Sequence, residues 1–329
     1  MPYVDSFARP IEYLRVSVTD RCNLRCRYCM PEEGVPPITH EAVLRYEEIT
    51  RLVRIAVTMG LSHVRLTGGE PLVRRDIVDL VKQLAALPGL DDLSMTTNGM
   101  LLERYARPLA QAGLQRINLS LDTLRPERFH AITRLGDVEQ VLRGREAALA
   151  AGLRPVKVNT VVIRGMNDDE IVDLARLTLL PDWHVRFIEV MPLGAGAEWS
   201  ARSSVPIAEI RARLEAVWGP LTAVRGELGV GPARYYQLPG AAGTVGFISP
   251  VSDHFCHLCN RLRLTSDGRL LPCLMSDHAI DLRTPLRAGA DDAELQAIFR
   301  QAMLEKPREH HLAQRPLPEC ALPMSTVGG

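Results

Sequence analysis

The stretch that decides the fold and the chemistry is residues 15–29, RVSVTDRCNLRCRYC. A strand-like run, Tyr13–Val18, leads into three cysteines, Cys22, Cys26 and Cys29, spaced C-x3-C-x2-C. The chain opens without a basic start and apolar core, so we expect no secretory signal and a reducing, cytoplasmic compartment, where disulfides are rare. Clustered cysteines in that setting are more often metal ligands or catalytic groups.

A second cysteine group is spaced C-x2-C-x13-C and consists of Cys256, Cys259 and Cys273. Structural zinc sites use four protein ligands, and a [4Fe–4S] cluster normally takes one thiolate per iron. Two groups of three thiols therefore suggest two clusters, each with an open iron. Zinc remains an alternative, completed by a distant histidine at the first group and by His254 or His257 at the second. Cys320 stands alone, and its role is left open.

The composition is that of an ordinary globular protein. Hydrophobic residues make up 46% of the 329 residues and charged residues 24%, which excludes a disordered chain. Lys+Arg and Asp+Glu are both 39, so the formal net charge is +0. Proteins that coat nucleic acid or anionic membranes are usually basic, and no apolar run approaches the roughly 18 residues of a transmembrane helix. We therefore expect neither a nucleic-acid nor a membrane partner.

The first 190 residues alternate strand-like and helical segments. Strands are expected over Tyr13–Val18, His63–Leu66, Leu93–Thr97, Arg116–Leu121, Val156–Val162 and Val185–Val190. Helices are expected over Glu41–Met59, Arg75–Leu87, Leu101–Ala112, Val138–Ala151 and Asp168–Leu180. This alternation predicts an α/β fold with a parallel sheet and helices outside it. Six units are too few for a closed eightfold barrel, so we expect an incomplete TIM-type (β/α)6 barrel, with a doubly wound sheet as the alternative.

The remaining sequence is less regular from Pro192 to Gly243. Further elements are expected over Ile207–Val217 (helix), Arg261–Thr265 with Arg269–Leu271 (hairpin) and Asp292–Met303 (helix). The hairpin is predicted because an Asp-Gly step separates two apolar runs. We divide the chain into a barrel domain, residues 1–225, and a C-terminal region, residues 226–329, with the second cysteine group and a Gly-Gly tail.

The unusual residues follow the ends of the predicted strands, where such folds build their active sites. They include the first cysteine group, Gly68, Gly69, Glu70, Thr96, Ser120 and Met191. Cations also interrupt the apolar strands at Arg15, Arg65 and Lys157. A charge inside a barrel is costly unless it is paired or binds an anion, so an internal salt bridge or an anionic ligand is expected. Arg261 and Arg263 alternate along one strand and so share one face.

Two motifs resemble the radical S-adenosylmethionine superfamily: the first cysteine segment, with Tyr28 before its last cysteine, and Thr67-Gly-Gly-Glu-Pro71. The resemblance implies that a reduced cluster on Cys22, Cys26 and Cys29 cleaves S-adenosylmethionine to a 5′-deoxyadenosyl radical. It also implies cofactor contacts at Tyr28, Gly68, Gly69, Glu70, Ser120 and Met191.

A narrower resemblance joins residues 15–31, the Thr-Asn-Gly turn at 97–99, the second cysteine group with Asn260–Arg263 behind it, and Gly328-Gly329. Together these are similar to the GTP 3′,8-cyclase family, lyases of the first step of molybdenum cofactor biosynthesis. The resemblance implies two [4Fe–4S] clusters, S-adenosylmethionine, and conversion of GTP to 3′,8-cyclo-7,8-dihydro-GTP. The residues it assigns to GTP are Arg15, Arg65, Thr96, Lys157, Arg261, Leu262 and Arg263. The resemblance also implies that Arg261 and Arg263 are catalytic, together with Cys22, Cys26 and Cys29. It implies that the open iron of the second cluster coordinates the guanine of GTP.

Partners follow from the same resemblance. They are GTP as substrate, a flavodoxin- or ferredoxin-like electron donor, cyclic pyranopterin monophosphate synthase as recipient of the product, and a second copy in a homodimer. Two other functions stay open. One is a peptide-modifying radical S-adenosylmethionine enzyme with an auxiliary cluster. The other is a zinc-dependent nucleic-acid-binding protein, which the zero net charge disfavours.

Overall fold

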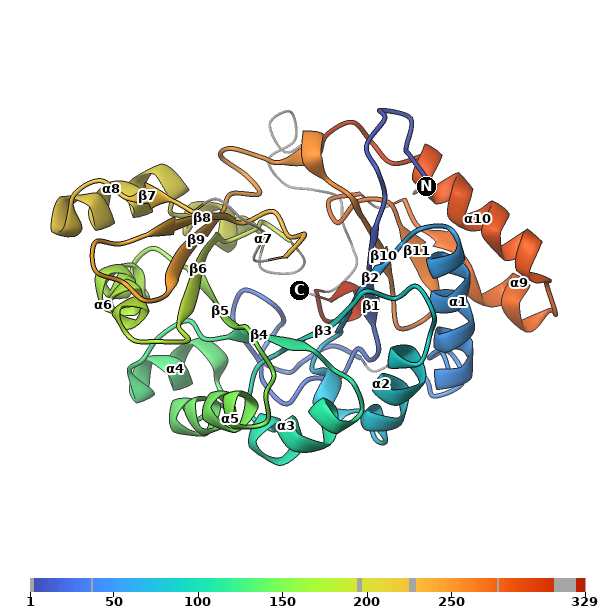
Figure 1. Ribbon diagram of the computed structural model, residues 1–329, viewed down its shortest axis with the longest axis horizontal. Coiled ribbons are helices and arrows are strands. Elements are labelled where there is room, and N and C mark those ends of the chain that lie inside the picture. The colour runs from blue at the N-terminus through green and yellow to red at the C-terminus, as the bar shows by residue number, and fades with distance from the viewer. Residues whose placement is uncertain are drawn as a thin grey trace.

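The structure is a computed structural model that describes residues 3–36, 38–193, 197–224, 229–276, 278–310 and 324–328. A curved sheet forms its centre, and helices cover the convex side (Figure 1). The first six strands are β1 (Tyr13–Ser17), β2 (His63–Thr67), β3 (Asp92–Thr97), β4 (Arg116–Ser120), β5 (Val156–Val162) and β6 (His184–Glu189). They are parallel and lie in sequence order, as the strand–helix alternation predicts.

The helices between these strands pack their apolar faces on the sheet. They are α1 (Tyr46–Thr58), α2 (Ile77–Ala85), α3 (Leu102–Gln111), α4 (Pro126–Thr133), α5 (Val138–Ala150) and α6 (Ile171–Arg176). Short 3-10 turns precede α2 at η1 (Pro71–Val73) and flank α6 at η2 (Asp168–Glu170) and η3 (Leu177–Leu179). In α1, Ile49, Leu52 and Val53 recur at helical spacing and are buried, so one stripe of the helix joins the core.

The later segments extend the sheet at both ends. Beside β1 lie β10 (Arg261–Leu264), β11 (Arg269–Leu271) and β12 (Ile280–Asp281), and beside β6 lie β9 (Thr244–Ile248), β8 (Arg234–Gln237) and β7 (Thr222–Ala223). Strands β10 and β9 run parallel to β1 and β6, whereas the outer strands run antiparallel. In the described part of the chain, the result is a mixed 12-stranded sheet whose two edge strands do not pair with each other, consistent with an incomplete barrel.

The other elements are α7 (Ala197–Arg202), α8 (Ile207–Trp218), η5 (Cys256–Leu258), α9 (Arg283–Arg287), α10 (Asp292–Leu304) and α11 (Met324–Val327). Helix α10 begins at a capping box, in which Asp291 and Glu294 satisfy each other's backbone N–H groups. Helix α11 lies inside the curve of the sheet, near β1 and β10 (Figure 1).

The six predicted strands and the hairpin are confirmed to within one or two residues. Three predictions need correction. The predicted helix from Glu41 begins only at Tyr46, because residues 41–43 form turns before the Arg45 N-cap. The segment Asp168–Leu180 is not one continuous α-helix: the short helix α6 lies between the 3-10 turns η2 and η3. The interval Pro192–Gly243, expected to be loose, also supplies strands β7 and β8 at one edge of the sheet.

Side chains alternate along β1, so one strand serves two environments. Leu14 and Val16 belong to the hydrophobic core under the helices. Tyr13 and Arg15 take the other face, where the Tyr13 ring lies 5.2 Å from the Arg65 guanidinium and Arg15 borders a cavity. The concave face of the sheet is therefore where the polar chemistry can gather.

Candidate functional site

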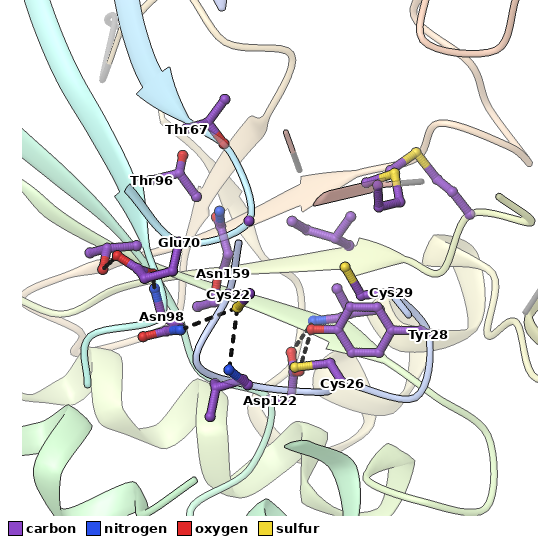
Figure 2. Close-up of a pocket in the computed structure, with 18 of the residues that line it drawn as sticks. Cys22, Cys26, Tyr28, Cys29, Thr67, Glu70, Thr96, Asn98, Asp122 and Asn159 are labelled. Atoms are coloured by element: carbon purple, nitrogen blue, oxygen red, sulfur yellow. Dashed lines mark hydrogen bonds between the residues drawn. The ribbon is translucent and has the colours of Figure 1, made fainter. Parts of the chain in front are cut away.

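The first cysteine group lines a cavity at the carboxyl ends of the strands (Figure 2). The loop after β1 turns sharply there, since the N–H groups of Cys29 and Met30 both donate to the Cys26 carbonyl, at 2.9 and 3.1 Å. At its start, the Leu24 N–H lies 3.4 Å from Cys22 Sγ. Asn98, from the loop after β3, reaches the same sulfur at 3.8 Å. Three thiols of one loop are thus aimed into one cavity.

These thiols are poor acids without a metal. Burial raises the pKa of Cys22 to about 11 and that of Cys29 to about 12. Burial, with repulsion from Cys29 and Asp122, raises the pKa of Cys26 well above its ordinary value. Since the metal ligand is the thiolate, positive charge must enter the cavity for the three to ionise together. The donor set therefore fits a cationic iron–sulfur core.

The Gly-Gly segment after β2 lies directly against the cysteine loop. Gly69 N–H donates to the Thr19 carbonyl and Glu70 N–H to the Arg21 carbonyl, both at 2.8 Å. A Cβ on Gly68 would lie 2.5 Å from the Thr19 oxygen, and one on Gly69 2.3 Å from the Arg21 oxygen. Only glycine permits this approach, which brings the two motifs to one wall of the cavity.

The Glu70 side chain holds that wall together. Its carboxylate accepts from Leu72 N–H at 3.0 Å, Thr97 Oγ1 at 2.7 Å and Asn98 N–H at 2.7 Å. Burial raises its pKa to about 7, against these hydrogen bonds. Glu70 therefore ties the turn after β2 to the turn after β3.

Opposite this wall, Tyr28 Oη donates to Asp122 Oδ2 at 2.7 Å, and Val161 N–H donates to Asp122 Oδ1 at 2.8 Å. Burial raises the pKa of Asp122 to about 6. Ser120 and Met191 also line this cavity. Asp122 and Asn159 line it as well, although neither was among the residues predicted to bind a cofactor or GTP. Asn159 Oδ1 is buried with no hydrogen-bond partner in the described part of the chain.

The second cysteine group lines an adjoining cavity, and Asn159, Ile188 and Met191 border both. Although burial opposes it, the positive charges of Arg261 and Lys306 lower the pKa of Cys259 to about 6. Arg261 Nη2 lies 4.0 Å from Cys259 Sγ. This group sits in a strongly cationic environment, unlike the first.

Cations from five strands of the sheet, the adjacent β10, β1 and β2 and the adjacent β5 and β6, face this second cavity or lie beside it: Arg15, Arg65, Lys157, Arg186 and Arg263. Burial and repulsion by Arg263 lower the pKa of Arg15, and burial lowers that of Arg65 to about 10. Burial and repulsion by Arg261 lower the pKa of Arg263 to about 10. Mutually repelling buried cations indicate a site built for a highly charged anion.

Arg186 is not among the predicted site residues, although its position in an apolar strand could have indicated it. It interrupts an apolar strand just as Arg15 does, and its Nη2 donates to Asn118 Oδ1, at 2.5 Å. One predicted GTP residue is placed differently: Leu262 is fully buried in the hydrophobic core, so its backbone alone could reach a ligand. Thr96 lines the first cavity, and its buried Oγ1 has no partner among the described residues.

A sequence model of the family described as "Radical SAM superfamily" matches residues 16–178, and one described as "Molybdenum Cofactor Synthesis C" matches residues 183–312. The chain is 54% identical to the GTP 3′,8-cyclase of Heliobacterium modesticaldum, over 99% of this chain and 100% of that one. It is 52% identical to that of Pelotomaculum thermopropionicum, over 94% and 95%. The chain belongs to the GTP 3′,8-cyclase family.

The fold agrees with this membership. Streptococcus suis SuiB bound to S-adenosylmethionine superimposes with a TM-score of 0.63 over 94% of this chain and 77% of that one, at 15% identity. Such low identity supports the fold of the cyclase chain and nothing finer. Within its described residues, no helix combines the length and the apolar character needed to cross a membrane.

The C-terminal segment of this family member enters the site. Arg263 Nη1 donates to the carbonyl of Gly328 and lies 3.4 Å from that of Val327. Gly328 has a φ of +76°, and a Cβ there would lie 2.2 Å from Thr67. Met324 lines the first cavity. Gly329, the second glycine of the predicted tail, and Cys320 lie outside the described residues.

Histidines stand beside the second cysteine group, as the sequence suggested. Ligand atoms of His254, Cys256 and His310 lie within 4.8 Å of one another, whereas His257 is exposed. His310 Nε2 also lies 2.8 Å from the Pro250 carbonyl. His254 and His310 could therefore bind a metal ion together with Cys256.

Proposed function

We propose that the protein converts GTP to 3′,8-cyclo-7,8-dihydro-GTP as a radical S-adenosylmethionine lyase, the first step of molybdenum cofactor biosynthesis. The observation that carries this proposal is the joining of two cysteine-lined cavities inside one barrel, with buried cations at the second. When bound and reduced, the first cluster supplies the electron that cleaves S-adenosylmethionine to a 5′-deoxyadenosyl radical. The chain's own residues hold both substrates and exclude water from the radical.

Both cysteine groups suit a cluster better than one zinc ion. Zinc at about 2.3 Å from each thiolate would draw the sulfurs to roughly 3.8 Å of one another. Within the described residues, ligand atoms converge within 4.8 Å at His254, Cys256 and His310, and at neither cysteine triplet. A [4Fe–4S] cluster gives each thiolate its own iron and so separates them more widely. Cys22, Cys26 and Cys29 would hold one cluster, and Cys256, Cys259 and Cys273 the other.

The walls of the first cavity supply the contacts for S-adenosylmethionine. Gly68 and Gly69 keep their backbone close to the cysteine loop and line the first cavity, so their peptide groups could contact the cofactor. Tyr28, Ser120 and Met191 complete the proposed contacts. Glu70 acts through the backbone it holds, because its carboxylate already accepts three bonds from the chain.

The cations of the second cavity place the triphosphate. Arg15, Arg65 and Arg263 converge from neighbouring strands, and Lys157 and Arg186 lie on the strands opposite. Arginine binds oxyanions bidentately, so this set suits phosphate oxygens. Thr96, with its unpartnered hydroxyl, and Arg261 would contact the rest of GTP between the two clusters. A peptide substrate would leave most of these charges unmatched.

An anaerobic assay tests the proposal. Reconstituted protein with GTP, S-adenosylmethionine and dithionite should yield 5′-deoxyadenosine and the cyclised nucleotide in equal amounts. Formation of 5′-deoxyadenosine without a GTP-derived product would support the radical chemistry and overturn the choice of substrate.

Three further proposals depend on this function. An electron donor of the flavodoxin or ferredoxin type reduces the first cluster, and cyclic pyranopterin monophosphate synthase receives the product. The protein works as a cytoplasmic homodimer. The boundary between a barrel domain and a C-terminal region at residues 225 and 226 stays a prediction.

GTP binding should take up a proton through Lys157. Burial, with repulsion from Arg186, Arg116 and Arg65, lowers the pKa of this amine to about 6. It is therefore mostly neutral at pH 7.5 without GTP, and a neighbouring triphosphate favours the protonated form. Because protonation then costs more as pH rises above 6, GTP affinity falls with increasing pH. Calorimetry at pH 7.5 in buffers of different ionisation enthalpy measures the uptake.

The matched variant is Lys157→Arg, whose guanidinium stays protonated throughout this range. It should bind GTP with a smaller proton uptake and a flatter pH profile than the parent. Equal proton uptake in the two proteins would assign the proton to another group, such as the γ-phosphate.

Substitution of His254 should leave the second cluster intact. If this site is a cluster on three thiolates, His254→Asn keeps the same iron content, and zinc stays near zero. Metal analysis of anaerobically purified protein measures both. A loss of iron, or of a bound zinc, would instead make His254 the fourth ligand and close the iron that the proposed mechanism needs.

A further inference from the structure

Lys306 is a buried lysine outside the set of residues that resemblance assigns to the site. Lys306 lies two residues after the end of helix α10, and the residue is only 3% exposed. The ammonium donates to the Arg261 carbonyl at 2.9 Å and to the Pro272 carbonyl at 2.7 Å. Its side chain also lines the second cavity together with Cys256, Cys259 and Cys273. Two of the three protons of the ammonium group therefore have backbone acceptors.

Those acceptors surround the second cysteine group. Pro272 precedes Cys273, and Arg261 opens strand β10 two residues after Cys259. One ammonium thus fixes the backbone beside two of the three thiols. On the other side, Arg9 Nη1 donates to the Cys256 carbonyl at 2.6 Å, so the third thiol has a separate anchor.

Among the described residues, no carboxylate balances the charge of Lys306, because no ion pair joins it to an aspartate or glutamate. A buried charge without a counter-ion is costly, whereas carbonyl oxygens offer only partial charge. Lys306 lines the second cavity together with Cys256, Cys259 and Cys273. A negatively charged group held by these cysteines would therefore balance the charge of this lysine.

We infer that Lys306 is a positioning residue for the second cluster: it fixes the backbone beside Cys259 and Cys273, and its charge favours the reduced state of the cluster. This inference rests on the proposed function, because it requires a cluster on Cys256, Cys259 and Cys273. Net charge and hydrogen bonds to the ligating sulfurs are main determinants of cluster potential. One-electron reduction adds one negative charge, which an adjacent ammonium stabilises.

The test isolates the second cluster in a parent that carries Cys22→Ser, Cys26→Ser and Cys29→Ser. Lys306→Met removes the charge at similar length, Lys306→Arg keeps it, and Lys82→Met, at an exposed lysine of α2, is the matched control. Iron is counted, and the reduced cluster is followed by EPR during a dithionite titration with redox mediators. Lys306→Met should shift the reduction equilibrium at least tenfold toward the oxidised state, about 59 mV for one electron. Lys306→Arg and Lys82→Met should stay near the parent.

Each other outcome is informative. Loss of iron in Lys306→Met alone, with circular dichroism unchanged, also supports the inference, because restoring the charge in Lys306→Arg restores the cluster. Equal potentials in Lys306→Met and the parent would overturn it, as would loss of iron in both Lys306 variants. A parent without iron would refute the second cluster itself, and so the proposed function rather than the role of this lysine.

Discussion

Cys26→Ser is expected to abolish cleavage of S-adenosylmethionine completely. The Cys26 carbonyl organises the loop by accepting from two N–H groups, and burial raises the pKa of the Cys26 thiol well above its ordinary value. A serine hydroxyl is a harder and less acidic ligand than a thiol, so it cannot replace a thiolate on iron. The amount of 5′-deoxyadenosine formed with dithionite as reductant measures this loss of cleavage directly.

Iron analysis localises the defect of that variant. The parent should hold about eight irons per chain and Cys26→Ser about four, because the second cysteine group is untouched. Cys320→Ser is the matched control, since neither cysteine motif uses this residue, and it should keep the parent's iron and activity. Full activity in Cys26→Ser would contradict the assignment of Cys26 as a ligand of the first cluster.

Arg263→Ala is expected to weaken GTP binding by about tenfold to a hundredfold, the range for loss of one or more charge-assisted hydrogen bonds. Arg263 is buried on β10, pairs in register with Arg15 and holds the Gly328 carbonyl. Removal of its guanidinium takes a cation from the proposed triphosphate site and frees the C-terminal segment. Equilibrium binding of GTP to reconstituted protein, under anaerobic conditions, measures the change.

Two controls separate charge from general damage. Arg263→Lys keeps a cation and should retain more affinity than Arg263→Ala, while Arg107→Ala removes an exposed arginine of α3 and should change nothing. Iron content should stay at the parent value in all three. An unchanged affinity in Arg263→Ala would remove β10 from the GTP site.

Local patterns predicted much of this molecule because its barrel is built from consecutive units. Strand and helix periodicities located β1 to β6, and the Asp-Gly step located the β10–β11 hairpin. Parallel neighbours along the chain then follow from the short right-handed connections that such units make. The structure of the segment after Asp168 was harder to predict, because short 3-10 turns on either side of an α-helix give nearly the apolar spacing of one continuous α-helix.

The pairing of distant segments could not be predicted in that way. Strand β10 pairs with β1 across more than half of the chain, and β9 pairs with β6 beyond an irregular interval. No local periodicity records which edge of a sheet a later strand will join. That pairing brings Arg263 beside Arg15, and thereby joins the second cysteine group to the barrel.

By itself, the sequence determined the chemistry available: two groups of three thiols, a Gly-Gly-Glu turn, and charges set into apolar strands. These are properties of spacing along the chain, which local sterics and burial preferences fix. Only the tertiary structure decided which of them meet. It buried Leu262 away from the cavity, added Arg186 to the cations, and placed Lys306 against Cys259, because contacts between distant segments depend on how the whole core packs.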